Sequence, residues 1–253
     1  MEEIAIFTSH KAASLKTVSY HIAKAASKHG VRAFVEYRQI PSTILRSQGG
    51  CALIVMPVDP LYATPWILLA RDCRKGHVPA IYYGPVEGRL NTKYIHPWMR
   101  EVVFVAPSNY VREKLVEAGL NVSAVVHHGV DMDEVSEAKH NAKHARKALL
   151  ARAGFKEDDI IVLTVSSSQP RKGLALYARV TKLMAQKNPH VKFYVLTDEK
   201  ALELDWAKEN TFIDTNMGKY TREDVMSMIA AADILTHPAM AEGFGLPVLE
   251  AHA

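Results

Sequence analysis

The sequence contains only two cysteines in 253 residues, Cys51 and Cys73. Two cysteines do not suggest a disulfide framework or a cysteine metal cluster, so we expect buried thiols in a reducing cytoplasm. No apolar run approaches the ~20 residues of a membrane-spanning helix. The first residues, Met-Glu-Glu-Ile-Ala-Ile-Phe-Thr, also lack the basic segment that opens a signal peptide. These absences favour a globular protein of the cytoplasm.

The charge is divided unevenly along the chain, although the net charge is only +4. Residues 1–130 carry 15 Lys and Arg against 9 Asp and Glu, a balance of +6, whereas residues 131–253 carry 16 against 18, a balance of −2. Two explanations of this asymmetry are open. The charges can belong to solvated helix faces, or the N-terminal half can make peripheral contact with an anionic membrane surface, a lipid-linked phosphate or an acidic glycan. The sequence shows no nucleic-acid motif with interleaved aromatic residues, so we expect no nucleic-acid partner.

Short apolar segments alternate with amphipathic segments along the chain, which predicts an α/β fold with doubly wound parallel sheets. The strands predicted in the first half span residues 4–8, 31–37, 52–56, 79–83 and 102–106. The strands predicted in the second half span residues 160–165, 191–197, 212–214 and 234–236. We therefore expect two Rossmann-like domains, residues 1–129 and residues 130–253, with ligands at the carboxyl ends of the strands.

The C-terminal stretch, residues 232–253, combines a short apolar strand, a glycine-rich loop and the start of a helix. Pro247 suits the first helical turn, where its missing N–H would have no partner. The N–H groups expected in front of this helix belong to Gly243, Phe244, Gly245 and Leu246. The positive end of the helix macrodipole points to the same place, so the loop predicts an anion site. Glu242 and Glu250 bracket the loop, an arrangement that suits a phosphorylated ligand with hydroxyl groups.

A second candidate anion site follows the strand predicted at residues 160–165. The loop Ser-Ser-Ser-Gln-Pro-Arg-Lys-Gly, residues 166–173, opens a helix that we expect to end near residue 186. Arg171 and Lys172 would converge with the N-terminal amides of that helix on one point, which suits a diphosphate. An Arg-Lys pair in a loop is otherwise often solvated. Its placement between the first strand and helix of the second predicted domain favours ligand binding.

The C-terminal stretch resembles the nucleotide-sugar site of family 4 retaining glycosyltransferases, which have the GT-B fold of two Rossmann-like domains. A Glu-x7-Glu pair alone is a weak pattern. The resemblance depends on its context, since the pair encloses Gly-Phe-Gly-Leu-Pro and follows Ala-Asp-Ile and His-Pro. It extends to the loop of residues 166–173 and to residues 104–119, which are similar to the last helix region of the family's N-terminal domain. Family members continue beyond the Glu-Ala helix, so an incomplete second domain is expected.

The resemblance implies a hexosyltransferase-type enzyme that moves a sugar from a nucleotide diphosphate sugar to a glycan, a lipid-linked or a small-molecule acceptor. It implies retention, no metal and no cofactor beyond the donor. The residues assigned to catalysis are Glu242, Lys172 and Arg171. The residues assigned to donor binding are Gly243, Phe244, Gly245, Leu246 and Glu250. In this assignment Glu242 contacts the donor sugar and Glu250 the ribose hydroxyls. The alternatives are a non-catalytic nucleotide- or glycan-binding protein and a nucleotide-sugar epimerase.

The sequence departs from the family pattern at three places. The first loop, Ser-His-Lys-Ala-Ala-Ser at residues 9–14, lacks the usual glycine-rich turn. His128 stands where the family has the Asn of an Asn-Gly-Val-Asp turn, and serines occupy residues 166–168, where an arginine is common. His10 in the first loop and Glu87 in a Gly- and Pro-rich turn are the candidates for the acceptor side.

Two short patterns resemble metal sites without predicting one. Asp131-Met-Asp133 matches the Asp-x-Asp of the other large glycosyltransferase fold, but it lies in the turn between the two predicted domains. His127 and His128 are adjacent, so in extended backbone their side chains point to opposite faces and cannot share one ion. We therefore expect no metal site.

Overall fold

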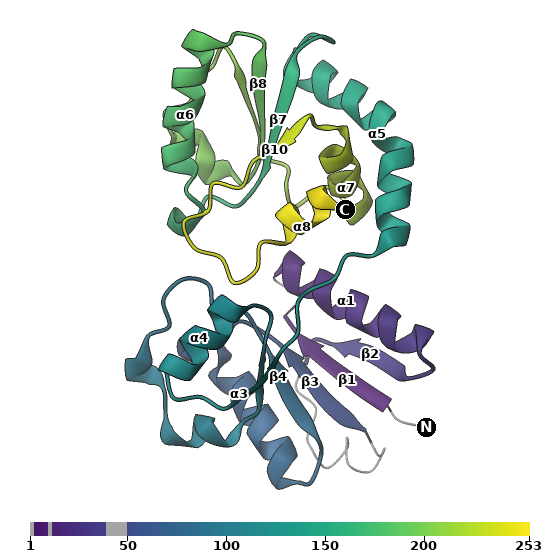
Figure 1. Ribbon diagram of the computed structural model, residues 1–253, viewed down its shortest axis with the longest axis vertical. Helices are drawn as coiled ribbons and strands as arrows, with labels where there is room; N and C mark the ends of the chain where they lie inside the picture. The colour runs from purple at the N-terminus through teal and green to yellow at the C-terminus, as the bar shows by residue number, and fades with distance from the viewer. Residues whose placement is uncertain (1–2, 10–11, 39–49) are drawn as a thin grey trace. The chain divides into compact units, whose positions relative to one another are not determined.

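The computed structural model of the chain describes residues 3–9, 12–38 and 50–253 (Figure 1). The candidate acceptor residue His10 lies outside them. The structure divides into two compact units. The first comprises Met1–Gly129 together with Glu242–Phe244, and the second comprises Val130–Ala241 together with Gly245–Ala253.

The first unit contains a parallel sheet with the strand order β2-β1-β3-β4-β5-β6. Its strands are β1 (Glu3–Thr8), β2 (Arg32–Glu36), β3 (Cys51–Val55), β4 (Ala80–Tyr83), β5 (Phe104–Ala106) and β6 (Val122–Val125). Its helices are α1 (Ala13–Lys28), α3 (Pro60–Lys75) and α4 (Asn109–Glu117), with short 3-10 helices η1 (Thr92–Tyr94) and η2 (Pro97–Glu101). Because β2 and β3 flank β1 on opposite sides, the strand order reverses at β1, as in doubly wound sheets.

The second unit contains a parallel sheet with the order β10-β7-β8-β9. Its strands are β7 (Ile160–Val165), β8 (Val191–Leu196), β9 (Thr211–Asp214) and β10 (Ile234–Leu235). Its helices are α5 (Met132–Ala153), α6 (Leu174–Lys187), α7 (Arg222–Ala231) and α8 (Leu246–His252), with 3-10 helices η3 (Pro170–Lys172) and η4 (Glu199–Glu203). The predicted α/β fold with parallel sheets is confirmed.

Both faces of the second sheet are buried, which explains why its strands read as continuous apolar runs. Successive residues of β7 alternate between the faces: Ile161 and Leu163 pack in a core with side chains of α5 and α7, whereas Val162 packs with Leu174 and Tyr177 of α6. Figure 1 shows α5 and α6 on opposite sides of β7 and β8. The faces are thus covered by helices from both sides, and the loops at the strand ends are left to carry ligand-binding residues.

Capping residues fix the limits of α5. Asp131 is its N-cap, because its side chain accepts a hydrogen bond from the Asp133 N–H at 3.1 Å. Gly154 ends the helix in the left-handed conformation at φ 68°. The sequence predicts a helix rich in Lys, His and Arg over residues 134–153, and the structure starts this helix two residues earlier, at Met132.

Within the part of the chain that the structure describes, none of the helices combines the length and apolar character that crossing a membrane requires.

Candidate functional site

The loop after β7 is held by a carboxylate from the loop after β8. Asp198 accepts hydrogen bonds from the Ser168 N–H at 2.7 Å and from the Ser168 hydroxyl. It also accepts from the Lys200 N–H at 3.2 Å, as the N-cap of η4. Burial by itself raises the pKa of Asp198, but these hydrogen bonds outweigh it and leave the pKa lowered. An ionised Asp198 thus fixes the backbone that leads to the predicted phosphate-binding residues.

Arg171 joins this loop to the residues that precede Glu242. Its carbonyl accepts from the Met240 N–H at 2.8 Å, and its Nη1 donates to the Ala241 carbonyl at 3.3 Å. Its Nε donates to Gln169 Oε1 at 3.1 Å. The structure therefore brings the loop of residues 166–173 against residues 240–241 within the second unit. Arg171 and Lys172 are both half-buried in η3, immediately before α6.

Gly173 allows these two loops to approach each other. It precedes the first residue of α6 and has a left-handed backbone with φ 72°. A Cβ atom at this position would lie 2.1 Å from the Pro238 carbonyl oxygen. No side chain fits there, so the close contact of the loops requires glycine.

A chain of hydroxyl groups crosses the carboxyl ends of β7 and β10. Thr236 Oγ1 lies 2.6 Å from Thr164 Oγ1 and 2.5 Å from the Tyr177 hydroxyl of α6. The Thr236 N–H donates to the Leu163 carbonyl at 2.8 Å, directly after the last residue of β10. These contacts fix the start of the C-terminal stretch against the strand and helix that flank the Arg171-Lys172 loop.

Glu250 lies on α8 and is buried, with 6% of the residue exposed. Its Oε1 accepts from Arg222 Nη1 at 2.6 Å, and Arg222 Nε donates to Glu134 Oε2 at 3.2 Å. Arg222 begins α7 and Glu134 lies in the first turn of α5, so three helices meet at this arginine. Arg222 could not be predicted from the sequence, since its partners lie 88 and 28 residues away along the chain.

The predicted donor residues are divided between the units. Gly243 and Phe244 belong to the first unit, whereas Gly245, Leu246 and Glu250 belong to the second. Leu246 begins α8, and Gly245 before it is left-handed at φ 87°.

Gly243 packs closely within the first unit. Its carbonyl accepts from the Ser108 hydroxyl at 2.7 Å, and a Cβ atom on it would lie 2.5 Å from Pro85 Cβ. Pro85 and Gly84 follow the carboxyl end of β4, in the turn that also contains Glu87. Glu87 is exposed. The Gly84 turn and Gly243 thus lie at the carboxyl edge of the first sheet.

His128 packs against Phe244 in the first unit, with their ring centroids 4.7 Å apart in an edge-to-face arrangement. The Tyr83 hydroxyl donates to the Val126 carbonyl and lies 2.8 Å from His128 Nδ1. Because the tyrosine has one hydroxyl hydrogen, His128 Nδ1 is the donor in this pair. Burial and the neighbouring His127 lower the pKa of His128 from 6.5 to about 4. His128 is therefore neutral at pH 7, with Nε2 as its acceptor nitrogen.

A buried carboxylate that the sequence did not indicate lies at the end of β9. Asp214 Oδ2 accepts from the hydroxyls of Tyr194 and Tyr220 at 2.5 and 2.7 Å and from Arg152 at 3.2 Å. Its Oδ1 accepts from the N–H and the side-chain amide of Asn216. Burial by itself raises the pKa of Asp214, but this set of donors lowers it from 3.8 to about 2. The network fixes the start of the loop that follows β9, through Asn216.

We expect Asp214→Asn to remove a part of the acid sensitivity of folding. The pKa of Asp214 is lower in the folded state than in the unfolded state, so the ionised carboxylate stabilises the fold above about pH 4. This stabilisation is lost as the pH falls toward 2. A pKa shift of this size corresponds to ~2 kcal/mol in the free energy of unfolding. Urea unfolding of the wild type and the variant between pH 2 and pH 7 measures this difference.

The exposed Asp158 provides the control, since Asp158→Asn should keep the wild-type pH dependence. An Asp214→Asn variant whose stability changes with pH as steeply as that of the wild type would refute the assignment.

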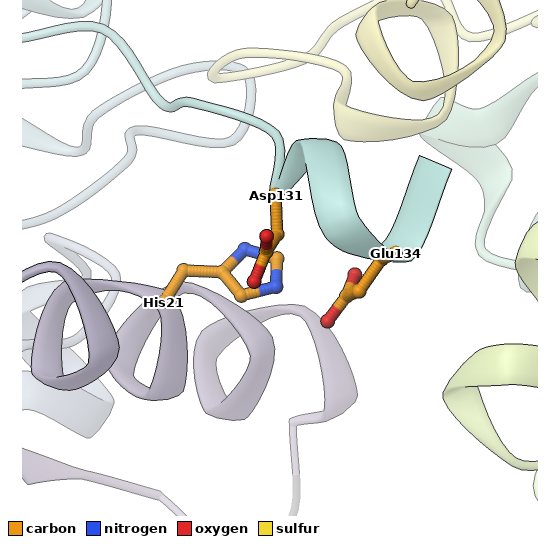
Figure 2. A group of neighbouring side chains, drawn as sticks. All are labelled: His21, Asp131 and Glu134. Atoms are coloured by element: carbon orange, nitrogen blue, oxygen red, sulfur yellow. The ribbon is translucent and has the colours of Figure 1, made fainter. Parts of the chain in front are cut away.

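Two carboxylates of the Asp131 region have structural partners in the second unit. Figure 2 shows Asp131 and Glu134 at the start of α5, drawn with His21, which belongs to α1 of the first unit. Asp131 caps the helix through Asp133, and Glu134 pairs with Arg222. These roles account for both carboxylates without an ion. The absence of a metal stays a prediction.

A cavity of about 380 Å³ lies at the amino ends of β7, β8 and β9. Among the residues that line it are Lys156, Asp159, His190 and Thr211. None of the predicted site residues contributes to it, because they follow the carboxyl ends of the strands. We therefore place the candidate site in the loops and not in this cavity.

Three curated proteins are similar in sequence, and all are glycosyltransferases by name. The uncharacterized glycosyltransferase 335 of Sulfolobus islandicus rod-shaped virus 1 is 25% identical over 178 residues, which cover 68% of this chain and 52% of the relative. The lipopolysaccharide glucosyltransferase WaaG of Escherichia coli K12 is 28% identical over 43% of this chain and 29% of the relative. The D-inositol 3-phosphate glycosyltransferase of Mycobacteroides abscessus is 30% identical over 51% of this chain and 29% of the relative. The matched regions thus span about half of these relatives' length or less.

Solved structures share the fold over nearly the whole chain. The UDP-forming α,α-trehalose-phosphate synthase of Burkholderia vietnamiensis has a TM-score of 0.68 at 12% identity, covering 99% of this chain and 81% of that one. A glycosyltransferase of Rickettsia africae has a TM-score of 0.64 at 14% identity, covering 99% and 76%. Residues 145–253 match the family described as glycosyl transferases group 1. The chain therefore has the α/β fold of these GT-B glycosyltransferases.

Proposed function

We propose that the protein is a glycosyltransferase that moves a sugar from a nucleotide diphosphate sugar to an acceptor. The observation that carries the proposal is the double contact of Arg171 with residues 240 and 241, which joins the loop before α6 to the segment that leads into Glu242. Both loops lie within the region that matches the glycosyl transferase family. A cationic loop at a helix N-terminus suits the diphosphate of a nucleotide sugar.

Lys172 and Arg171 supply positive charge to the leaving group. As the bond between the sugar C1 and the phosphate oxygen breaks, negative charge develops on the diphosphate. Two cations and the N-terminal amides of α6 stabilise that charge, which lowers the barrier without a metal. The departing phosphate oxygen then takes the proton of the acceptor hydroxyl, so the new bond forms on the face that the diphosphate leaves. The sugar is transferred with retention, and no protein base is needed.

The carboxylates orient the donor in this proposal. Glu242 contacts the transferred sugar, and Glu250 accepts hydrogen bonds from the ribose hydroxyls, as the family resemblance implies. The N–H groups of the loop before α8 assist with the phosphates; they belong to Gly243, Phe244, Gly245 and Leu246.

The acceptor is a glycan, a lipid-linked molecule or a small molecule, and His10 and Glu87 are the residues proposed for its side. The +6 balance of residues 1–130 supports peripheral contact with an anionic membrane surface by a cytoplasmic protein. No part of this proposal requires a cofactor beyond the donor.

The reaction is tested by incubating the protein with UDP-, GDP- and ADP-sugars and measuring the nucleoside diphosphate released, with and without glycan, lipid-linked and small-molecule acceptors. We expect release from one donor class, with a matching glycosylated product. Binding without release in any mixture would instead support a non-catalytic binding protein. Isomerisation of the donor sugar without an acceptor would support an epimerase.

A further inference from the structure

Arg222 occupies a position that α7 itself does not favour. It is the first residue of the helix, directly after the Thr221 N-cap, where the macrodipole is positive. The other charged residues of this first turn, Glu223 and Asp224, are acidic, and Asp224 forms a capping box with Thr221. A cation here does not stabilise the helix end, so its role depends on its partners outside α7.

The guanidinium of Arg222 contacts two carboxylates through different nitrogens. Nη1 lies 2.6 Å from Glu250 Oε1, and Nε lies 3.2 Å from Glu134 Oε2. Since the guanidinium is planar and rigid, the contact with Glu134 fixes the direction in which Nη1 points. Glu134 thus orients the arginine, and the arginine orients Glu250.

Glu250 needs this partner because it is desolvated, with only 4% of its side chain exposed. A carboxylate removed from water loses its solvation, and a charged hydrogen-bond donor compensates for that loss. The contact described uses Oε1, and a carboxylate has acceptor capacity beyond one such hydrogen bond. Glu250 can therefore pair with Arg222 and still accept from a ligand hydroxyl.

We propose that Arg222 is a positioning residue of the donor site, which holds the Glu250 carboxylate oriented for the ribose hydroxyls of a nucleotide. The inference rests on the proposed function, since it takes Glu250 as the ribose acceptor. In this proposal Arg222 itself touches neither the sugar nor the phosphates of the donor. Glu134 is the second member of this arrangement, because it fixes the guanidinium from the α5 side.

A purely structural role for the same ion pair predicts a different result. If Arg222 only ties α7 to α8 and α5, its removal weakens every nucleotide equally. If it positions Glu250, its removal affects only ligands that carry ribose hydroxyls. The ratio of affinities for a ribonucleotide and for its 2′,3′-dideoxy counterpart separates the two roles.

The experiment is calorimetric titration of UDP, GDP and ADP, each against its 2′,3′-dideoxy form, into the wild type and Arg222→Met. For the nucleotide that the wild type binds, we expect the ribose form to bind about 10- to 100-fold tighter, the range of a hydrogen bond to a charged group. Arg222→Met should lose this preference and bind both forms alike. Glu250→Gln should do the same, and the double variant should lose nothing further.

Arg222→Lys should restore part of the preference, since it keeps a cation near Glu250. The control is Arg179→Met, which removes an exposed arginine from α6 and should leave the preference unchanged.

An Arg222→Met variant that binds nucleotide with the full wild-type preference for ribose would overturn the positioning role while leaving the proposed function intact. Equal weakening of both forms would also overturn it, in favour of the structural role. A wild type that binds none of the three nucleotides would instead contradict the proposed function, and the inference with it.

Discussion

Gly173→Ala is expected to lower the free energy of unfolding through both backbone strain and a steric clash. The left-handed backbone at φ 72° costs an alanine about 1–2 kcal/mol. The new Cβ would also lie 2.1 Å from the Pro238 carbonyl oxygen, which is backbone and cannot rotate away. Forcing the two loops apart adds ~1–3 kcal/mol. The total is roughly 2–5 kcal/mol, measured as a decrease in the urea midpoint.

Gly154 offers a matched control for this substitution. It also has a left-handed backbone, at φ 68°, but no atom lies within 4 Å of the position its Cβ would take. Gly154→Ala should therefore cost only the backbone strain of about 1–2 kcal/mol. The difference between the two variants measures the clash. If both variants unfold at the same urea concentration, the loops around Gly173 are not packed as the structure shows.

Gly173→Ala should also weaken nucleotide binding, because it displaces the loop that carries Arg171 and Lys172. The Gly154→Ala variant should bind as the wild type does. Comparing the two at a temperature where both are folded separates the local effect on the site from the loss of stability.

Lys172→Ala is expected to have the largest effect on the proposed reaction. Removing one group that stabilises developing charge costs enzymes about 10²- to 10³-fold in rate. Binding of the nucleoside diphosphate should weaken by about 10-fold or more, since a hydrogen bond to a charged group contributes about 1.5–3 kcal/mol. Single-turnover rates of nucleotide release, together with calorimetric binding, measure both effects.

The control is Lys187→Ala. Lys187 is an exposed lysine in the last turn of α6, the helix that Lys172 precedes. Lys187→Ala changes the net charge by the same amount as Lys172→Ala, but it should leave the rate of nucleotide release and the affinity for the nucleotide unchanged. A Lys172→Ala variant that is no slower than Lys187→Ala would remove Lys172 from the catalytic assignment.

The sequence predicted strands such as β7 well, because burial on both faces makes such a strand a nearly continuous apolar run. Residues 160–165 were expected as a strand and form β7 with the same limits. The start of α5 was missed by two residues, since Asp131-Met-Asp133 was assigned to the turn between the two predicted domains although Asp131 is a helix cap. Caps and ligands use the same carboxylates, and the sequence alone does not separate them.

The loops of the candidate site could be predicted where residues adjacent in sequence act together. Arg171, Lys172 and Gly173 are of this kind. The serines of residues 166–168 were interpreted only as the loss of an arginine, whereas Ser168 hydrogen-bonds Asp198, 30 residues away. Distant contacts of this type have no periodicity or spacing in the sequence.

The networks around Asp214 and Arg222 show the same limit. Asp214 collects donors from Arg152, Tyr194 and Tyr220, which come from a helix, a strand and a loop. These residue types are common and their spacing along the sequence is irregular, so no sequence motif predicts the network. Only the packing of the helices on the sheet brings these side chains together.

The loop before α6 is proposed to bind the diphosphate of a nucleotide sugar. Calorimetric titration of UDP-, GDP- and ADP-glucose into the wild type and into Lys172→Ala, with Lys187→Ala as control, tests it most directly. We expect one of these nucleotide sugars to bind the wild type and Lys187→Ala alike, and to bind Lys172→Ala more weakly by about 10-fold or more. Absence of binding to the wild type, or equal affinity in all three proteins, would contradict it.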